Sequence, residues 1–369
     1  MSEVNDSPLR SVHTTSVVEI LTQLRASLVV TTYQAGKVIL MRVDEGKLNT
    51  HFRDFQKPMG CVGDPVRLTI GGTNTVWYLR NMPAVAPKLE PPGKHDAAYL
   101  PRRIHVTGDI DIHELAWDDA GELWIVNTRF SCLCTLDHDH SFVPRWRPHF
   151  ISGLALEDRC HLNGIGIRNG KLEYATALGE TDTAGGWRAN KRDGGILMDV
   201  PGNEVLLRGL SMPHSPRWYR DKLWILESGR GSLAWVDLEQ KQVHTVALLP
   251  GFTRGLSFIG PLAFIGLSQV RETATFSGLP LTERLEERTC GVWVVNIESG
   301  QVLGFIRFEE GVQEIFAVQA LGGIRFPELV PWNDPKTFNS YVLPDDALKD
   351  VVVPEPEAKP APEAAPPAK

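Results

Sequence analysis

Three histidines occupy matching places in three successive repeats of the sequence, and their side chains are able to bind a metal ion. His113, His161 and His214 each begin a segment that reads as a first strand and is followed by an apolar second strand. Neutral imidazole is a common ligand of zinc, iron and copper, and three histidines with an open coordination position are typical of a catalytic site. These residues therefore predict a centre for a divalent transition metal (Fe, Cu or Zn).

The elements that position these histidines are predicted to be blades of a β-propeller. Each repeat contains a first strand, a stronger second strand with an aromatic residue and two outer strands, and the repeats begin near Met59, His113, His161, His214 and Arg254. A repeat of about 50 residues is typical of a propeller blade, and the innermost strands of all blades surround the central axis. Equivalent residues of successive repeats are therefore expected to meet at one mouth of the central channel.

A sixth blade is divided between the two ends of the chain. Segments 28–33, 38–42 and 48–53 read as strands two to four without a first strand, and segment 314–321 reads as a lone first strand. Joining them closes the ring and leaves only short, protected edges. The prediction is an all-β, six-bladed β-propeller closed by strands from both termini. Seven blades are the alternative, because residues 82–108 fit the repeat poorly.

Composition and charge exclude several classes of protein. The 33 Gly, 26 Pro and 10 Trp favour many short strands and turns. The net charge of −7, without a local run of Lys or Arg, argues against nucleic acid as a partner. No stretch approaches the roughly 20 apolar residues of a membrane span, and a signal sequence is missing, so we expect a cytoplasmic protein without a membrane partner. The five irregularly spaced cysteines are expected to be free thiols.

The chain divides into three regions. Residues 1–26 are predicted to be a polar leader that ends in a short helix over 16–25, where apolar residues follow a helical period. Residues 27–335 are assigned to the propeller. Residues 336–369 form a Pro-, Ala- and Glu-rich tail that is expected to be disordered from about residue 350.

Further polar residues are expected at the same mouth as the histidines. Arg254 and Glu314 occupy the equivalent positions of the next two repeats. A guanidinium beside a metal needs an anion between them, so Arg254 is predicted to bind a carboxylate or another oxyanion of the substrate; the alternative is an ion pair with Glu314 or another acid at the mouth. Glu314 is a candidate fourth ligand or orienting group, and Tyr33 and Glu227 are candidates for general acid–base catalysis.

Two long loops between second and third strands border this mouth. They span 179–195 and 268–291, and loops of such length in a compact domain are often functional. The first is expected to act as a lid on a polar substrate, with a mobile surface loop as the alternative. The substrate-binding candidates from the loops around the mouth are Arg129, Glu180, Trp187, Arg188 and Arg271.

Four short motifs carry a resemblance to a known family. They are Tyr-Gln-Ala-Gly at 33–36, Leu-Gly-Glu-Thr-Asp at 178–182, Gly-Gly-Trp-Arg at 185–188 and His-Ser-Pro-Arg-Trp at 214–218. The chain resembles an uncharacterised bacterial family known mainly as a domain of unknown function, over most of residues 16–335. This resemblance implies a propeller and carries no activity.

In architecture the chain is also similar to six-bladed NHL, strictosidine-synthase-like and gluconolactonase-like propellers, in which a central metal recurs. The peptidyl-hydroxyglycine lyase resembles it most in chemistry, since three propeller histidines surround a metal there. His113, His161 and His214 would match that site, and Arg254 would match its arginine in kind only. Likeness of fold alone does not assign a function.

Together these residues predict a metal-dependent enzyme with a three-histidine centre, acting on a small polar or peptide substrate. The chemistry is either of lyase or hydrolase type or of Fe or Cu oxygenase type, because imidazole suits all three metals. The alternative is a non-catalytic propeller that binds a peptide or protein partner at the same face. In that case the histidines are hydrogen-bonded to the blade backbones around channel water.

Overall fold

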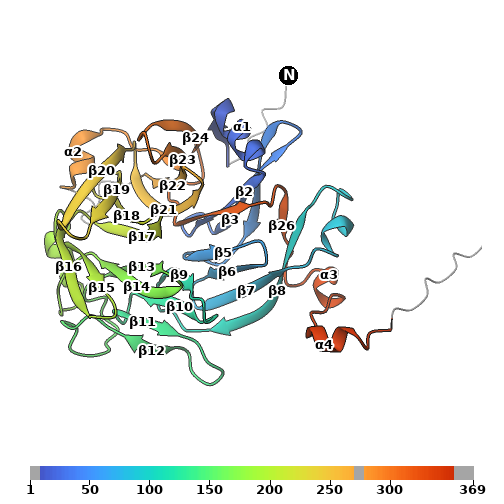
Figure 1. The fold of residues 1–369 in the computed structure, drawn as a ribbon, viewed down its shortest axis with the longest axis horizontal. Coiled ribbons are helices and arrows are strands. Elements are labelled where there is room, and N and C mark those ends of the chain that lie inside the picture. The colour runs from blue at the N-terminus through green and yellow to red at the C-terminus, as the bar shows by residue number, and fades with distance from the viewer. Residues whose placement is uncertain (1–8, 270–277, 353–369) are drawn as a thin grey trace, which may run out of the picture.

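The described residues form a ring of six β-sheets around a central axis (Figure 1). The computed structural model describes residues 9–269 and 278–352. Each sheet is a blade of four antiparallel strands, and two blades carry one additional strand at the outer edge. The architecture is an all-β, six-bladed β-propeller, which confirms the prediction.

The blade that closes the ring combines both ends of the chain. From the axis outward, its strands are β25 (Ala317–Gly322), β2 (Ala26–Thr32), β3 (Lys37–Asp44) and β4 (Lys47–Asp54). The register runs from Ala26 opposite Gly322 to Thr31 opposite Ala317. Closure by strands from both termini is therefore confirmed, but β25 begins later than expected and leaves Glu314 in the preceding loop.

Five further blades follow one another along the chain. The first contains β5 (Cys61–Gly63), β6 (Arg67–Gly71), β7 (Thr75–Asn81) and β8 (Ala97–Val106), with β26 (Pro327–Leu329) parallel to β8. The next contains β9 (Ile112–Trp117), β10 (Leu123–Asn127), β11 (Cys132–Thr135) and β12 (Val143–Trp146). It is followed by β13 (Leu162–Arg168), β14 (Lys171–Ala177), β15 (Gly195–Asp199) and β16 (Glu204–Leu210). Then come β17 (Pro213–Tyr219), β18 (Lys222–Glu227), β19 (Ser232–Asp237) and β20 (Gln242–Leu248). The last contains β21 (Phe252–Ile259), β22 (Leu262–Ser268), β23 (Cys290–Asn296) and β24 (Val302–Phe308), with β1 (Ser11–His13) antiparallel to β24.

The segment 82–108 is a long excursion within one blade. It contains the 3-10 helix η1 (Ala86–Lys88) and all of β8, which pairs with β7 from Thr75 opposite Val106 to Asn81 opposite Tyr99. The segment therefore supplies a fourth strand and no additional blade, which excludes the seven-bladed alternative.

The core lies between neighbouring blades. Every residue of β2 and of β22 is buried, because each strand belongs to a sheet that is covered on both faces by other blades. One cluster combines Leu28, Phe264 and Val292 with Val17 and Leu21 of α1 (Thr15–Gln23), the predicted N-terminal helix. Close packing of this kind fixes the inner ends of the blades and hence the side chains at the axis.

A buried carboxylate holds β26 near the closing blade. Glu328 lies within ion-pair distance of Arg53 (2.8 Å), His51 (3.3 Å), Arg42 (3.5 Å) and His95 (3.5 Å). Burial alone would raise the pKa of Glu328, but the hydrogen bond and charge of His51 and the charges of the two arginines outweigh burial and lower it to about 2. This network joins the C-terminal strand to β3 and β4.

Besides α1 and η1, the described residues contain four short helices outside the blades: η2 (Gly186–Asn190), α2 (Pro280–Arg284), α3 (Pro335–Phe338) and α4 (Asp345–Leu348). In the part of the chain that the structure describes, none of the helices has the length and apolar character of a membrane span. The disorder expected near the end of the chain concerns mainly residues 353–369, which lie outside the described ranges.

Candidate active site

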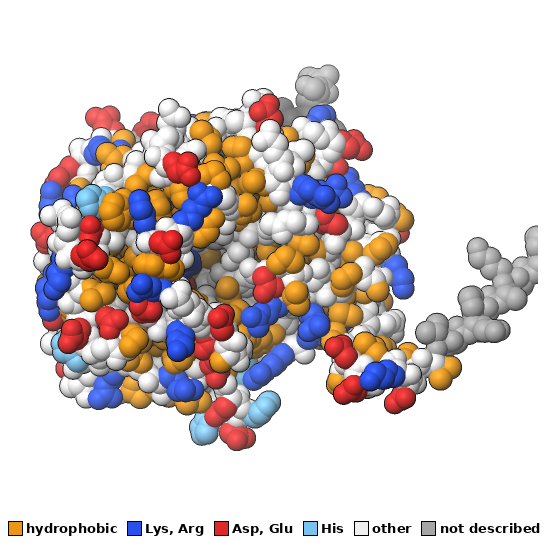
Figure 2. Space-filling view, in the orientation of Figure 1, with side chains coloured by type: hydrophobic (Ala, Val, Ile, Leu, Met, Phe, Trp, Pro, Cys, Tyr) orange, Lys and Arg blue, Asp and Glu red, His pale blue; other side chains and the backbone are white. Residues whose placement is uncertain are grey.

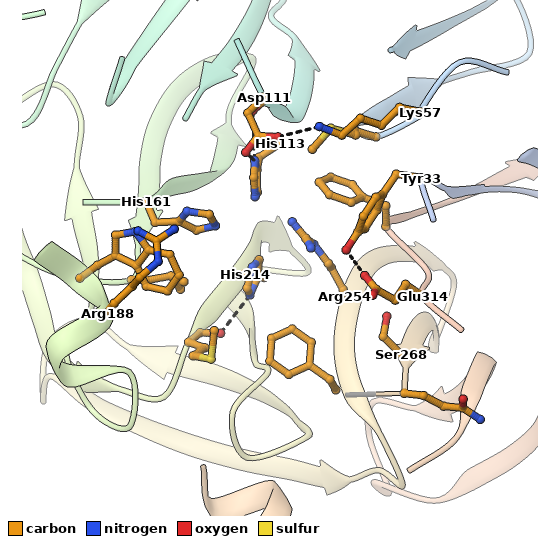
Figure 3. A pocket seen from close by; sticks show the side chains of 17 residues that line it. Tyr33, Lys57, Asp111, His113, His161, Arg188, His214, Arg254, Ser268 and Glu314 are labelled. Carbon is orange, nitrogen blue, oxygen red and sulfur yellow. Dashed lines mark hydrogen bonds and ion pairs between the residues drawn. The ribbon is translucent and has the colours of Figure 1, made fainter. Parts of the chain in front are cut away.

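A cavity of about 330 Å³ opens at one mouth of the central channel, and the ring is hollowed near its middle in the axial view of Figure 2. All six blades contribute to the lining. Many of the residues predicted at this mouth do lie together here (Figure 3): Tyr33, His113, His161, Trp187, Arg188, His214, Arg254 and Glu314. The remaining lining residues are Lys57, Met59, Asp111, Leu178, Met212, Phe252, Ser268, Gln269 and Phe316.

His113 is fixed through its Nδ1 atom. This nitrogen lies 3.1 Å from the carbonyl oxygen of Asp111 and 2.8 Å from Oγ1 of Thr128. The Thr128 hydroxyl donates its own hydrogen to the carbonyl oxygen of Leu162 at 2.6 Å, so it acts as an acceptor toward the imidazole. Because Nδ1 faces acceptors, we assign the ring hydrogen to Nδ1, which leaves the lone pair on Nε2.

His214 repeats this arrangement two blades further on. Its Nδ1 lies 3.0 Å from the carbonyl oxygen of Met212 and 2.8 Å from Oγ of Ser228. The Ser228 hydroxyl donates to the carbonyl oxygen of Thr253 at 2.5 Å. The same assignment therefore holds, and Nε2 of His214 also keeps its lone pair.

Left-handed backbone presents the two carbonyl acceptors. Asp111 and Met212, each two residues before a histidine, have φ angles of 55° and 49°. Such conformations cost non-glycine residues about 1 kcal/mol or more and concentrate at functional sites. Their occurrence at both equivalent positions indicates that the orientation of His113 and His214 outweighs this cost.

His161 is oriented by a carboxylate. Its Nδ1 lies 3.0 Å from both carboxylate oxygens of Asp158. Asp158 also accepts a hydrogen bond of 3.0 Å from Nε1 of Trp187, whose ring packs against the His161 ring with centroids 4.5 Å apart. A carboxylate behind an imidazole fixes its tautomer and makes it a stronger metal ligand.

The three imidazoles leave their Nε2 atoms for the cavity. Figure 3 shows the rings around one space, and the His113 and His161 centroids are 4.7 Å apart. Within residues 9–269 and 278–352, no group of three His, Cys, Asp or Glu side chains is arranged closely enough to hold a metal ion. The donor set fits Zn, Fe or Cu by its chemistry, since all three rings are oriented through Nδ1, and binding would require the side chains to rearrange.

Arg254 brings a cation into the space between His214 and Tyr33 (Figure 3). Its Cζ atom lies 3.6 Å from the centroid of the Phe316 ring, and its buried Nη2 atom has no hydrogen-bond partner within residues 9–269 and 278–352. Among the described residues it forms no ion pair, so the alternative of a pair with Glu314 is not supported. Burial lowers the pKa of Arg254, yet a guanidinium stays charged at neutral pH. Such a group favours an anion in the cavity.

Glu314 pairs with Tyr33, whose hydroxyl donates a hydrogen bond to the carboxylate. Burial raises the pKa of Tyr33 strongly, the charge of Glu314 raises it further, and Arg254 acts in the opposite direction. The phenol is therefore protonated at neutral pH. The pair places a proton donor and a proton acceptor beside Arg254.

An ion pair narrows the channel on the far side of the histidines. Arg217 of β17 donates to the carboxylate of Glu114 of β9, and the same carboxylate accepts a 2.8 Å hydrogen bond from the backbone of Ile165. Only a space of about 10 Å³ lies between this pair and the histidines. A ligand therefore enters from the mouth.

Several residues of the site were not predicted. Lys57 and Asp111 lie 3.5 Å apart at the rim, and Asp158 lies 3.6 Å from Arg188, which was predicted. The orienting hydroxyls of Thr128 and Ser228 follow their histidines by 15 and 14 residues, directly after the second strand in both repeats. That recurrence is a sequence signal that could have identified them.

Other predicted residues lie outside the cavity. The Glu227 carboxylate accepts hydrogen bonds from the backbone of Ser211 and from Arg230, both at 3.1 Å, so the structure does not bring it to the site. Arg129 pairs with Asp109, and Glu180 pairs with Arg208, both away from the cavity lining. Arg271 lies outside the described residues.

The buried histidines predict a pH dependence of stability. Burial lowers the pKa values of His113 and His214 well below 6.5, and nearby positive groups, Arg254 among them, lower them further. The unfolded chain binds protons on both residues near their ordinary pKa and the folded protein does not. The free energy of unfolding should therefore be level above about pH 7 and fall as the pH drops below about 6.5. Urea unfolding from pH 8 to 5.5 measures this dependence. In a His113→Gln/His214→Gln variant, the free energy of unfolding should change less steeply with pH than in the wild type. An equal slope would show that these two histidines do not cause the pH dependence.

Comparison with known proteins identifies the family. A family model described as "Domain of unknown function (DUF4915)" matches residues 15–330. The chain belongs to the DUF4915 family. The match extends from α1 to the residue after β26, so it covers all six blades except the added outer strand β1. The sequence-based resemblance to a family of unknown function is confirmed.

No curated protein matches this DUF4915 chain significantly. Among solved structures it is similar to a chain of a nidogen/laminin complex (9% identity, TM-score 0.48, covering 80% of this chain and 97% of that chain). It is also similar to a protein of unknown function from Bacteroides caccae (9% identity, TM-score 0.49, 80% and 98%). A third similarity is to virginiamycin B lyase from Staphylococcus aureus (10% identity, TM-score 0.37, 74% and 74%). None of these likenesses bears on the activity of the DUF4915 propeller.

Proposed function

We propose that this protein is a metal-dependent enzyme whose centre consists of His113, His161 and His214. One observation carries the proposal: each Nδ1 is held by an acceptor of the protein, so that each Nε2 keeps its lone pair for a ligand in the cavity. Imidazoles oriented in this way are typical of metal sites. A bound Zn, Fe or Cu ion would supply Lewis-acid activation or, for Fe and Cu, activation of oxygen.

The other polar groups of the cavity have complementary roles in this proposal. Arg254 binds an oxyanion of a small polar or peptide substrate, because its guanidinium lacks a partner among the described residues. Tyr33 donates a proton or a hydrogen bond to the substrate, and Glu314 accepts a proton. We also propose a cytoplasmic location, since all five cysteines are free and buried, which suits a reducing compartment.

Metal analysis of protein purified without a His tag tests the proposal. Wild-type protein should retain about one equivalent of a transition metal after desalting, and His161→Ala should lose most of it. His140→Ala is the matched control, because His140 is exposed and pairs only with the nearby Asp137, and it should retain the metal. Arg254→Ala should also keep the metal while losing activity.

Two results would contradict the proposal. One is wild-type protein that holds no metal even after incubation with Zn, Fe and Cu salts. The other is a His161→Ala variant that holds as much metal as the wild type. The first would favour a non-catalytic propeller that binds a peptide or protein partner at the same mouth.

A further inference from the structure

Among the described residues, the cavity has one cation without an ion-pair partner and one apolar wall, and together they define a class of substrate. We infer that the substrate is a monocarboxylate of about amino-acid size whose body is apolar. This inference rests on the proposed function, in which the cavity that contains Arg254 is the substrate site. It adds that the substrate has a single carboxylate and that the rest of the substrate is apolar.

The charges of the lining allow one anionic group. Three cations reach the cavity in the described part of the chain, and two of them already face carboxylates: Lys57 lies 3.5 Å from Asp111, and Arg188 lies 3.6 Å from Asp158. Arg254 alone lacks such a partner there, and its Nη2 is buried without a hydrogen bond. A planar guanidinium held against Phe316 matches the two oxygens of one carboxylate.

Apolar side chains form another part of the lining. Leu178, Trp187, Met212 and Phe252 belong to one buried cluster, which also contains Leu279 and Leu281 outside the lining. The Trp187 ring packs at a tilt against His161, and Phe252 lies edge-on to His214 with ring centroids 5.8 Å apart, so the wall adjoins two of the histidines. A hydrocarbon body placed here removes apolar surface from water, whereas a second charged group would be desolvated without a partner.

The dimensions limit the length of the substrate. A cavity of about 330 Å³ is at the small end of ligand sites. Beyond the histidines Glu114 and Arg217 narrow the channel, and a space of only about 10 Å³ remains there. A carboxylate on Arg254 and an apolar body against Met212 and Trp187 therefore account for most of the space, which favours a free acid of amino-acid size over an extended peptide.

Binding of simple probes tests this inference without any assay of turnover. Isothermal titration calorimetry would compare 3-phenylpropionate with 3-phenylpropanamide, which lacks the charge, with acetate, which lacks the body, and with phenylsuccinate, which adds a second charge. 3-Phenylpropionate should bind at least about 10-fold more tightly than each of the others. Arg254→Met should abolish the preference for the acid over the amide. Met212→Gln should weaken the binding of 3-phenylpropionate several-fold and that of acetate only slightly. The control Arg220→Met removes a surface arginine that is paired with Glu298, and it should change the binding of neither probe.

Any of three results would overturn the inference. They are equal binding of the acid and the amide, binding of acetate or phenylsuccinate as tight as or tighter than that of 3-phenylpropionate, and no binding of 3-phenylpropionate. Titrations of both the protein as purified and the chelator-treated protein separate it from the metal proposal. Selective binding by a protein that holds no metal would support the substrate class and reject the metal centre. A metal-loaded protein without this selectivity would support the metal centre and reject the substrate class.

Discussion

Replacing Arg254 with methionine should make the protein more stable, by about 1–2 kcal/mol in the free energy of unfolding. The guanidinium lies in a cavity, and among the described residues its buried Nη2 has no hydrogen-bond partner. Desolvating a cation that no carboxylate contacts directly costs several kcal/mol. The cation–π contact with Phe316 stabilises the folded protein by only about 0.5–2 kcal/mol. Methionine fills a similar volume against the same ring and removes the charge. Stability that increases when a residue is removed indicates that the residue is retained for function.

Urea unfolding of metal-free protein at pH 7 measures this effect. Arg217→Met is the matched control, because Arg217 also lies at the central axis but has Glu114 as its partner. That variant leaves a buried carboxylate unpaired and should lose about 3 kcal/mol. If Arg254→Met were destabilised to a similar degree, Arg254 would have a structural partner and would not be an anion site.

Replacing Glu328 with glutamine should cost about 3 kcal/mol and weaken closure of the ring. The carboxylate faces Arg42, Arg53, His51 and His95, and loss of its charge leaves Arg42 buried without compensation. Glu298→Gln, which removes the partner of the exposed Arg220, should have little effect.

The pH dependence gives a second measure of the same network. The pKa of Glu328 is lowered from 4.5 to about 2 in the folded protein. The folded state therefore binds this proton less readily than the unfolded state. The stabilisation is complete above about pH 5 and is lost as the pH falls toward 2. In the Glu328→Gln variant, the free energy of unfolding should fall less between pH 5 and pH 2 than in the wild type. An equal fall in both proteins would show that Glu328 does not control the loss of stability in acid.

Much of the fold could be predicted because the propeller repeats are visible in the sequence. Strand pairs such as 214–219 and 223–226 recur with similar spacing, and a lone first strand near residue 317 matches a missing first strand near residue 26. The same repeats brought His113, His161, His214 and Arg254 to one mouth. Equivalent positions in a closed ring must converge, whatever the side chains are.

The hydrogen-bonding of the site could not be predicted in this way. The carbonyl acceptors of His113 and His214 depend on left-handed backbone conformations at Asp111 and Met212. The sequence does not indicate such a conformation at either position. The carboxylate of Asp158 serves His161 and Trp187 together, from residues 29 positions apart. The charge state around Arg254 depended on whether Glu314 paired with it or with Tyr33, and both pairings were compatible with the sequence.

The central claim is that His113, His161 and His214 together bind one transition metal. Its most direct test is an anomalous difference map from crystals of the metal-loaded protein, recorded at the absorption edge of the metal found by elemental analysis. We predict a single strong peak in the cavity, about 2.0–2.1 Å from the Nε2 atoms of the three histidines. A map without a peak there, with the metal bound elsewhere or to only one of the three rings, would contradict the account.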